Sequence, residues 1–378
     1  MGAPVTDSKA IPAEPRLPPD KRFILLASRL WAWVFLGLMI VFFIIAVPLA
    51  GGATFLTLRN AMNILVAITP VLLLGLGQTF VIISAGIDLS VGWVMSLASV
   101  VSAHAIRASF NAGAPLLLAA TLGFLAAVGA SAGVGLVNGL IIAKLKVPAF
   151  IVTLGSSFIV RGMALLFSEN TTVIGLPAEI RDYGNESLFY VVNGEGGGFY
   201  AFFRPDVTGA MLRQMDRIFT WPVVITAIVV LICMFILNRT QFGRHTYAIG
   251  GNMQAALRTG IPVDRHIVKL YMLSSVTAGI AGFLSTLRFT AGSAVIGDPL
   301  LLSSIAAVII GGVSLFGGAG SIVGTVIGAL IIAVLTTGLV MMNVQAFWQF
   351  IVVGAVVIIA VLIDQSRDLI LGRRGRGS

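Results

Sequence analysis

The stretch that decides the fold runs from residue 31 to residue 50 and reads WAWVFLGLMIVFFIIAVPLA. It contains no charged residue. A helix needs about 20 mostly apolar residues to cross the roughly 30 Å hydrocarbon core of a bilayer. The apolar core of a cleavable signal peptide is shorter, at about 7–15 residues. We therefore expect this stretch to be the first membrane helix.

The same pattern recurs along the whole chain. Of its 378 residues, 58% are hydrophobic and 10% are charged, whereas a soluble domain carries about 25% charged residues. The composition excludes an ordinary soluble protein and predicts an all-α polytopic membrane protein. About ten transmembrane helices are expected, at residues 30–50, 61–83, 86–106, 115–142, 148–168, 221–238, 268–288, 299–316, 322–342 and 346–363.

Basic residues give the chain a net charge of +9, and they lie between the apolar runs. This placement indicates membrane topology rather than nucleic-acid binding. With ten spans and both ends inside, sixteen Lys and Arg residues lie inside and seven outside, and Arg161 falls within a span. The positive-inside rule therefore predicts cytoplasmic N- and C-termini. The chain divides into a flexible N-terminal tail (1–29), a transmembrane domain (30–364) and a basic C-terminal tail (365–378).

Two connections are long: 169–220 outside and 239–267 in the cytoplasm. Long loops in compact proteins are usually functional. The outer, periplasmic loop either contacts an external partner or is a tolerated insertion, and we favour the insertion. A dense run of glycines at 311–328 predicts tight helix packing, with a broken helix lining the path as the alternative.

An acidic residue lies between two apolar runs in the sequence ISAGIDLSVG at 83–92. Acidic residues within a membrane are costly and rarely face lipid. Asp88 and Ser90 are candidates to cap the following helix by accepting its free N–H groups. Alternatively, Asp88 faces a transport path and bonds hydroxyl groups of a solute.

Polar residues also mark the ends of the next two expected helices. Asn138 ends one helix, and Phe150 and Thr153 begin the next after Pro148. We expect Asn138 and Thr153 to form hydrogen bonds between helices. The alternative for all three side chains is contact with a solute in the path.

The cytoplasmic loop contains the sequence GRHTYAIGGNMQAALRTGI at 243–261. Asn252 is expected to cap a short helix over 253–259, which Gly260 ends in the left-handed conformation. A short capped helix among arginines is suited to docking another protein. An amphipathic helix lying on the membrane surface is the alternative.

Four stretches together resemble the permease subunits of ribose, xylose and arabinose type ABC importers. They are IDLSVG at 87–92, VPAFIVTLG at 147–155, AIGGN at 248–252 with AA at 255–256, and AAVIIGGVSLFGG at 306–318. The resemblance covers about residues 60–365. It implies a permease homodimer in the bacterial inner membrane, separate ATP-binding subunits on the cytoplasmic side and a periplasmic sugar-binding protein.

The resemblance also implies roles for particular residues. It places coupling to the ATPase on Gly250, Gly251, Asn252, Gln254, Ala255, Ala256 and Gly260. Gln254 stands where Glu is common in the wider superfamily, so an ion pair from that position to the ATPase is not implied. A tentative substrate path includes Asp88, Ser90, Asn138, Phe150 and Thr153.

The sequence contains no motif for chemistry of its own. No lysine follows a glycine, so there is no Gly-x-x-x-x-Gly-Lys-[Ser/Thr] loop for ATP phosphates. The three histidines and the single cysteine have no metal-binding spacing. We expect no enzyme activity, cofactor or metal on this chain, with ATP and Mg used by the partner ATPase.

An ion-coupled secondary transporter is the competing function. Such proteins place charged residues at mid-membrane for coupling, and here only Asp88 and Arg161 qualify. The sequence therefore favours the importer, which translocates a pentose, a hexose or a related polyol.

Overall fold

The structure is a computed structural model. It describes the chain except residues 1–18, 194–196, 206–208, 210, 212–213 and 371–378. Part of each expected tail lies outside this description. Within the described residues, α1 begins at Pro19 and α14 extends to Ile370.

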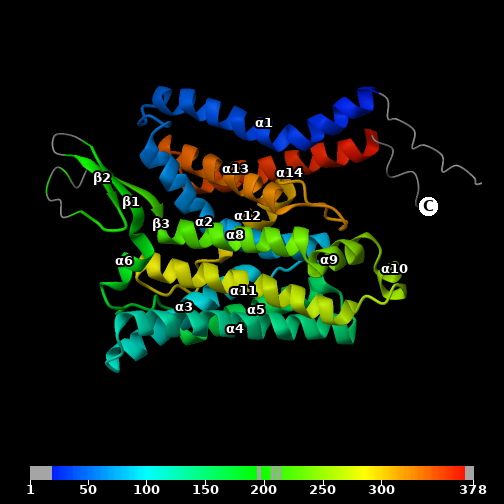
Figure 1. Cartoon of the computed structure of the whole chain (residues 1–378), viewed down its shortest axis with the longest axis horizontal. Helices are drawn as coiled ribbons and strands as arrows, with labels where there is room; N and C mark the ends of the chain where they lie inside the picture. Colours follow the sequence, from blue (N-terminus) through cyan, green and yellow to red (C-terminus); the bar gives the residue numbers. More distant parts are fainter. Residues whose placement is uncertain (1–18, 194–196, 206–208, 210, 212–213, 371–378) are drawn as a thin grey trace, which may run out of the picture.

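Long helices dominate the molecule and run roughly parallel to one axis (Figure 1). In the described part of the chain, eight helices are long and apolar enough to cross a membrane. They are α1 (Pro19–Leu49, apolar from Trp31), α2 (Leu58–Ile83), α3 (Val91–Asn111), α4 (Leu116–Leu145), α5 (Ala149–Phe167), α8 (Trp221–Arg239), α11 (Val263–Phe289) and α13 (Ile322–Met341). The expected polytopic α-helical protein is confirmed.

The other two expected spans are less regular. α14 (Ala346–Ile370) is apolar over Ala346–Val356 within the described side chains. α12 (Asp298–Ile310) has only 13 residues and cannot cross a bilayer alone. The expectation of a continuous helix over 299–316 was therefore wrong.

α12 is the inner half of a broken span. The preceding segment, 290–297, lies beside α3, where Ser293 N donates to Ser99 Oγ at 3.1 Å and Gly297 N donates to Ser96 Oγ at 2.9 Å. These serines satisfy backbone groups that a helix would pair internally, as non-helical backbone at membrane depth requires. Gly297 also touches Gly92: a Cβ built on Gly297 would lie 1.9 Å from the Gly92 carbonyl oxygen.

A glycine-rich turn (311–321) follows α12 and leads into α13. Gly317 and Gly318 have positive φ angles of 82° and 72°. Close packing is present as well, because a Cβ on Gly324 would lie 2.0 Å from the Gly311 oxygen. The glycine run therefore ends α12 and lets α12 and α13 approach closely, whereas its role in lining a path stays a prediction.

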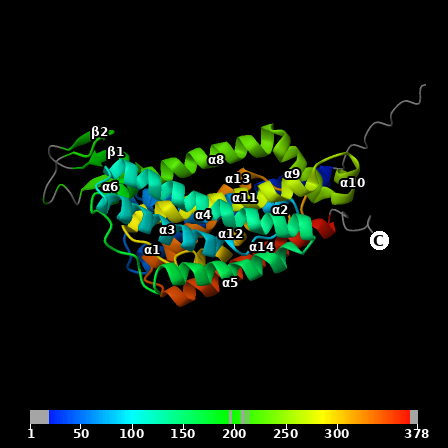
Figure 2. The same cartoon turned by 90° about the horizontal axis from the view of Figure 1, so that it is seen from below.

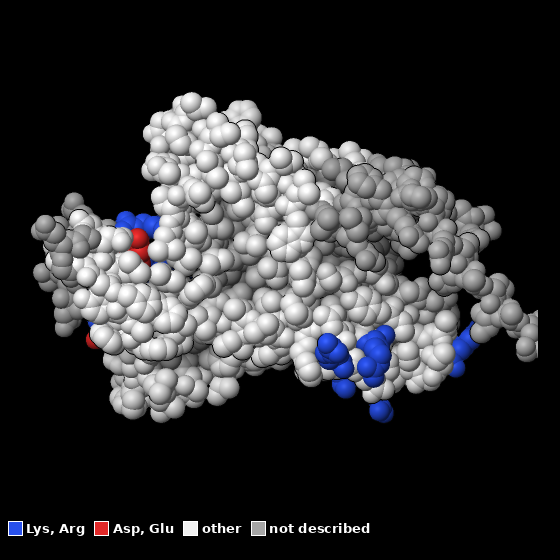
Figure 3. Space-filling view, turned by 45° about the horizontal axis from the view of Figure 1, so that its top comes forward, with Lys and Arg blue, Asp and Glu red and all other residues white. Residues whose placement is uncertain are grey.

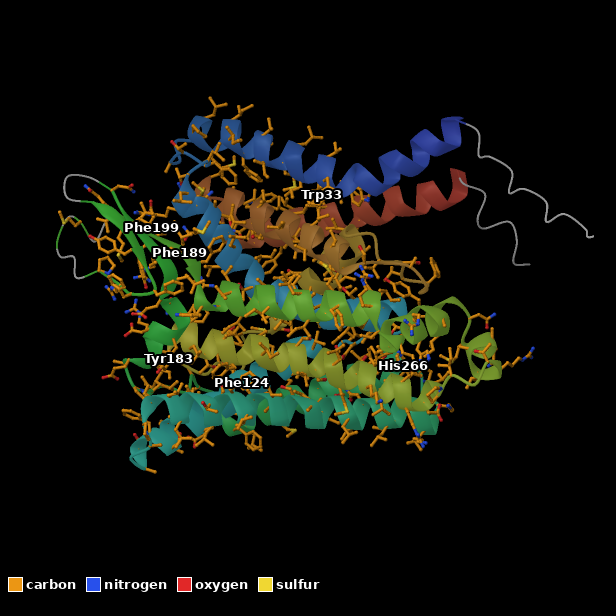
Figure 4. All side chains as sticks on the ribbon, viewed as in Figure 1. Trp33, Phe124, Tyr183, Phe189, Phe199 and His266 are labelled. Carbon is orange, nitrogen blue, oxygen red and sulfur yellow. The ribbon has the colours of Figure 1, made fainter. Side chains whose placement is uncertain are left out.

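α11 lies at the centre of the bundle, against α2, α3 and α4 (Figures 1 and 2). Small residues allow this approach: a Cβ on Gly135 or Gly139 of α4 would lie 2.5 or 2.7 Å from the α11 backbone. Lipid supplies no hydrophobic drive between helices, so close backbone packing is the main source of cohesion. Phe124 of α4 adds an edge-to-face contact with Phe283 of α11 at 5.3 Å (Figure 4).

The outer loop contains regular secondary structure, including strands that an all-helical expectation did not include. It contains the short helix α6 (Ile180–Asn185) and an antiparallel sheet of order β2-β1-β3. The strands are β1 (Ser187–Val192), β2 (Gly198–Ala201) and β3 (Met215–Thr220). Phe189 and Phe199 stack at 5.5 Å on this sheet (Figure 4). Arg59 of α2 forms a 2.8 Å ion pair with Asp216 of β3, so the sheet is tied to the bundle.

The opposite end of the bundle carries α9 (Gln241–Gly251) and α10 (Met253–Arg258). α1 begins and α14 ends at this same end (Figure 1). Figure 3 shows basic side chains gathered at this end and a smaller charged group at the sheet end, with a wide uncharged band between them on this face. An even number of crossings explains why α1 begins and α14 ends on one side. The assignment of that side to the cytoplasm stays a prediction from charge.

Candidate functional site

The turn between α2 and α3, residues 84–90, is organised around the Asp88 carboxylate. Its Oδ1 accepts hydrogen bonds from Ser90 N at 3.0 Å and Ser90 Oγ at 2.6 Å. Its Oδ2 accepts one from Ser274 Oγ of α11 at 2.8 Å. The Ser90 side chain makes no capping bond to α3. The expected cap is therefore replaced by a link between the turn and α11.

Side chains from three more helices converge on this turn. Asn138 Nδ2 of α4 donates to Ser90 Oγ at 3.1 Å, and Thr153 Oγ1 of α5 lies 3.2 Å from the Ile87 carbonyl oxygen. Gln78 Nε2 of α2 donates to the Asp88 carbonyl oxygen. The expected interhelical hydrogen bonds of Asn138 and Thr153 are present. We call Gln78, Asp88, Ser90, Asn138, Thr153 and Ser274 the polar junction.

The polar junction is closed to solvent. Asp88, Ser90 and Thr153 are fully buried, and Asn138 is 1% exposed. In this conformation the Asp88 side chain faces other helices of the same chain rather than an open path. Phe150, the remaining candidate, contributes no side-chain hydrogen bond to the junction and is 52% exposed on α5.

Two members of the polar junction were missed from the sequence. Gln78 offered a signal, since an amide in the middle of an apolar run usually has a specific partner. Ser274 offered none, because a serine in a membrane helix resembles any other small packing residue.

The expected short helix of the inner loop is confirmed as α10. Asn252 Oδ1 accepts a hydrogen bond from Ala255 N at 2.9 Å, and Gly260 has a φ of +81°. Ala256 is buried at 3% exposure, whereas Gln254 and Ala255 are exposed. α10 also exposes two apolar side chains that the sequence analysis did not single out, Met253 at 43% and Leu257 at 46%.

α9 links α10 to the α2–α3 turn. Gly250 lies against the end of α2, where a Cβ would be 1.7 Å from the Ile83 carbonyl oxygen. That same oxygen accepts a hydrogen bond from Gly318 N of the glycine-rich turn at 2.8 Å. The Gly251 position is open, with nothing within 4 Å of a built Cβ. α9, the α2–α3 turn and the glycine-rich turn therefore form one packed unit.

Two side-chain hydrogen bonds reinforce α9. Tyr247 OH donates to the Gly320 oxygen at 2.8 Å, and burial raises the pKa of this tyrosine, so its hydroxyl remains a donor. Thr246 Oγ1 lies 2.9 Å from His266 Nε2 of α11 (Figure 4). These bonds anchor α9 to both α11 and the glycine-rich turn.

α10 does not fill the space beneath it. A cavity of about 370 Å³ lies between α10, the α2–α3 turn and the α4–α5 connection. Met253 and Leu257 line it, and so does Tyr271 of α11, whose buried hydroxyl has no hydrogen-bond partner in the part of the chain that the structure describes. The space leaves room for α10 to shift against the bundle.

α5 carries an unusual charge. Arg161 is exposed, and its guanidinium carbon lies 4.8 Å from the centre of the Trp93 ring of α3. Among the described residues, no carboxylate lies within ion-pair distance of it. An arginine facing lipid near the membrane centre costs about 2.5–3.5 kcal/mol on insertion scales. The face of α5 that bears Arg161 is therefore unlike a lipid-facing surface.

The position of Trp93 sets the depth of this charge. His104 Nε2 of α3 lies 2.8 Å from the carbonyl oxygen of Phe167, the last residue of α5. Trp93 precedes His104 by 11 residues, which is about 16 Å along a helix. The contact between Arg161 and Trp93 thus lies about 16 Å from the end of α5, which is about half the thickness of a hydrocarbon core of roughly 30 Å.

Comparison with known proteins gives one family and several relatives. Residues 60–361 match the family described as "Branched-chain amino acid transport system / permease component". The chain is 35% identical over 328 residues to the fructose import permease protein FrcC of Rhizobium meliloti, covering 87% of this chain and 84% of the relative. It is 36% identical over 329 residues to the D-allose transport system permease protein AlsC of Escherichia coli (strain K12), covering 86% and 90%.

A third relative is the ribose import permease protein RbsC of Bacillus subtilis (strain 168). The identity is 35% over 334 residues, covering 88% of this chain and 92% of the relative. No solved structure matches the chain.

Proposed function

The chain belongs to the family of branched-chain amino acid transport system permease components, and on that basis we propose that it forms the transmembrane path of an ATP-driven importer for a monosaccharide. The assignment of a monosaccharide as the transported solute rests on the relatives of the chain. Permeases for fructose, D-allose and ribose each match more than four fifths of this chain at 35–36% identity. The chain is a transport subunit of the inner membrane and not an enzyme. The partner subunits bind ATP with Mg and hydrolyse it.

Two copies of the chain enclose the path in this proposal. α5 and α14 border the same face of the bundle (Figure 2). The two helices expose large apolar side chains, including Phe158 of α5 at 64% and Phe350 of α14 at 66%. α5 also exposes Arg161, which favours a protein or water-filled surface over lipid. A second copy placed against this face would shield the charge and leave a path between the two α5 helices.

The ATPase docks on α10. Met253 and Leu257 are apolar anchors on an exposed helix, the kind of surface that inserts into a groove of a partner. A shift of α10 reaches the α2–α3 turn through α9, since Gly250 touches the end of α2. The hydrogen bonds of the polar junction then transmit the movement to α4, α5 and α11. As these helices move, the path opens to the other side of the membrane.

The sheet end is the periplasmic side in this proposal. A separate sugar-binding protein delivers the solute there, above the outer mouth of the path. The sheet itself is an insertion held to α2 by the Arg59–Asp216 pair. Lipid covers the remaining sides of the bundle.

The α10 assignment predicts the effect of a double substitution. Replacing Met253 and Leu257 with serine removes two apolar anchors without touching a buried residue. Hot-spot side chains contribute about 1–2 kcal/mol or more each, so the affinity for the ATPase is expected to fall roughly tenfold or more. Titration of the purified permease with the ATPase measures this loss.

The matched control replaces Leu49 and Phe202 with serine at the opposite end, where they are 82% and 76% exposed. This pair removes similar apolar surface and is expected to leave the affinity unchanged. Equal losses in the two double variants would show that α10 is not the docking site.

Purification from the native host tests the proposal as a whole. The tagged chain, extracted gently, is expected to bring down an ATPase subunit that contains a phosphate-binding loop, at about one copy per permease. Uptake by the permease alone, driven by an ion gradient without ATP, would instead establish a secondary transporter. Uptake of leucine in place of the sugars would show that the transported solute is an amino acid.

A further inference from the structure

The start of α12 lies at the same depth as the contact between Arg161 and Trp93. The Gly297 backbone touches Gly92, which directly precedes Trp93. Asp298 is the first residue of α12, and its side chain is exposed. Because the outer half of this span is not helical, α12 begins within the membrane. An acidic side chain is thereby brought to the depth of the Arg161–Trp93 contact.

We propose that Arg161 and Asp298 contact the sugar as it crosses, and that these two residues form a mid-membrane half-site together with Trp93, whose ring is 6% exposed and supports the Arg161 guanidinium. The proposal rests on the function proposed above. A second copy of the chain supplies the other half-site across the path. No residue of the half-site belongs to the polar junction, and the resemblance stated above implies no role for any of the three.

The chemistry of the half-site matches a neutral, polyhydroxylated solute. The Arg161 guanidinium offers N–H donors only, and an ionised Asp298 carboxylate offers acceptors only. Sugar hydroxyl groups both donate and accept, so they can use both residues. One positive and one negative charge also leave the half-site neutral overall, which avoids retaining an anion or a cation.

The exposure of Arg161 and Asp298 argues for contact with a solute. Charged side chains inside a membrane almost always face a water-filled cavity or a partner group. Within the described residues, Asp298 forms no ion pair and Arg161 forms none. The next turn of α12 is open too, since Leu302 is 72% exposed. Both charges are therefore available to something outside this chain.

The test uses proteoliposomes that contain the complete transporter with its ATPase and binding protein. The probes are radiolabelled D-ribose, D-xylose, D-allose and D-fructose, supplied with the binding protein outside and ATP inside. Asp298→Asn keeps the side-chain size, Arg161→Gln keeps a shorter side chain with N–H donors, and both remove the charge. Each is expected to lower the uptake rate roughly tenfold, as for loss of a hydrogen bond from a charged group, while ATP hydrolysis persists.

Matched controls make the same changes on α6, outside the bundle. Arg181→Gln and Asp182→Asn replace exposed residues and are expected to keep the wild-type rate. Arg161→Lys keeps the positive charge but removes the planar guanidinium group. It is expected to change the relative rates of the four sugars, which a purely structural charge would not do.

Two results would overturn the half-site. One is wild-type uptake by both Arg161→Gln and Asp298→Asn. The other is recovery of transport in an Arg161→Asp and Asp298→Arg double variant, because recovery would identify a structural ion pair. If the wild type itself takes up none of the four sugars, the proposed function fails, and the half-site fails with it.

Discussion

Replacing Asp88 with alanine is expected to destabilise the whole bundle and to abolish transport. The substitution removes the acceptor of three hydrogen bonds, two from Ser90 and one from Ser274. Buried donors left without a partner cost about 1–3 kcal/mol each. We expect the free energy of unfolding to fall by about 3 kcal/mol or more.

The chain supplies its own reporter for this experiment. Cys233 is the only cysteine, and it is 1% exposed. A thiol-reactive fluorophore therefore labels the protein only as it unfolds. The temperature at which Cys233 becomes reactive is expected to fall by about 5 °C or more in Asp88→Ala.

Two controls grade the result. Ser274→Ala removes one bond of the polar junction and is expected to give a smaller decrease. Ser303→Ala removes a hydroxyl that bonds only within its own helix and is expected to have little effect. If Asp88→Ala labels at the wild-type temperature, the polar junction does not hold the bundle together.

The second large effect is expected at Gly250, where α9 meets the end of α2. Gly250→Val would place a Cβ 1.7 Å from the Ile83 oxygen, a position that no side chain can occupy. α9 must then move away from the α2–α3 turn. Overpacking of this kind costs about 1–3 kcal/mol, and we expect ATP-driven uptake to fall tenfold or more while the permease still inserts and binds its ATPase.

A glycine of α4 provides the control. A Cβ on Gly129 would meet nothing within 4 Å, so Gly129→Val is expected to transport at close to the wild-type rate. The two variants carry the same added atoms. Equal activity in both would show that the contact between Gly250 and α2 does not transmit the movement of α10.

The membrane helices could be predicted because each depends on its own residues. An apolar run such as 31–50 predicts a span without reference to the rest of the chain. α10 could be predicted for the same reason, since Asn252 and Gly260 act on the helix directly beside them. The structure of such segments is determined by residues that are adjacent in the sequence, so it does not depend on contacts made during folding.

The broken span could not be predicted, because its non-helical half depends on a distant partner. Segment 290–297 is stabilised by Ser96 and Ser99 of α3, about two hundred residues away in the sequence. The sequence of the segment itself does not indicate these hydrogen bonds. The strands of the outer loop were missed for a related reason, since a sheet is held together by contacts between separate segments.

The candidate site was predicted in part. Asp88, Ser90, Asn138 and Thr153 were identified from their polarity within apolar surroundings, and the structure brings all four together. Ser274 was missed because its importance lies in its position opposite Asp88, which only the packing of α11 reveals. Arg161 was seen as a charge within a span, but its depth follows from the hydrogen bond between α3 and α5.

The central claim is that this chain carries a monosaccharide across the membrane at the expense of ATP hydrolysed by a partner subunit. The direct test is uptake of radiolabelled ribose, xylose, allose and fructose into proteoliposomes that hold the assembled transporter. Uptake of at least one sugar that requires both ATP and the binding protein is the expected result. Uptake that proceeds without ATP when an ion gradient is imposed would contradict the account.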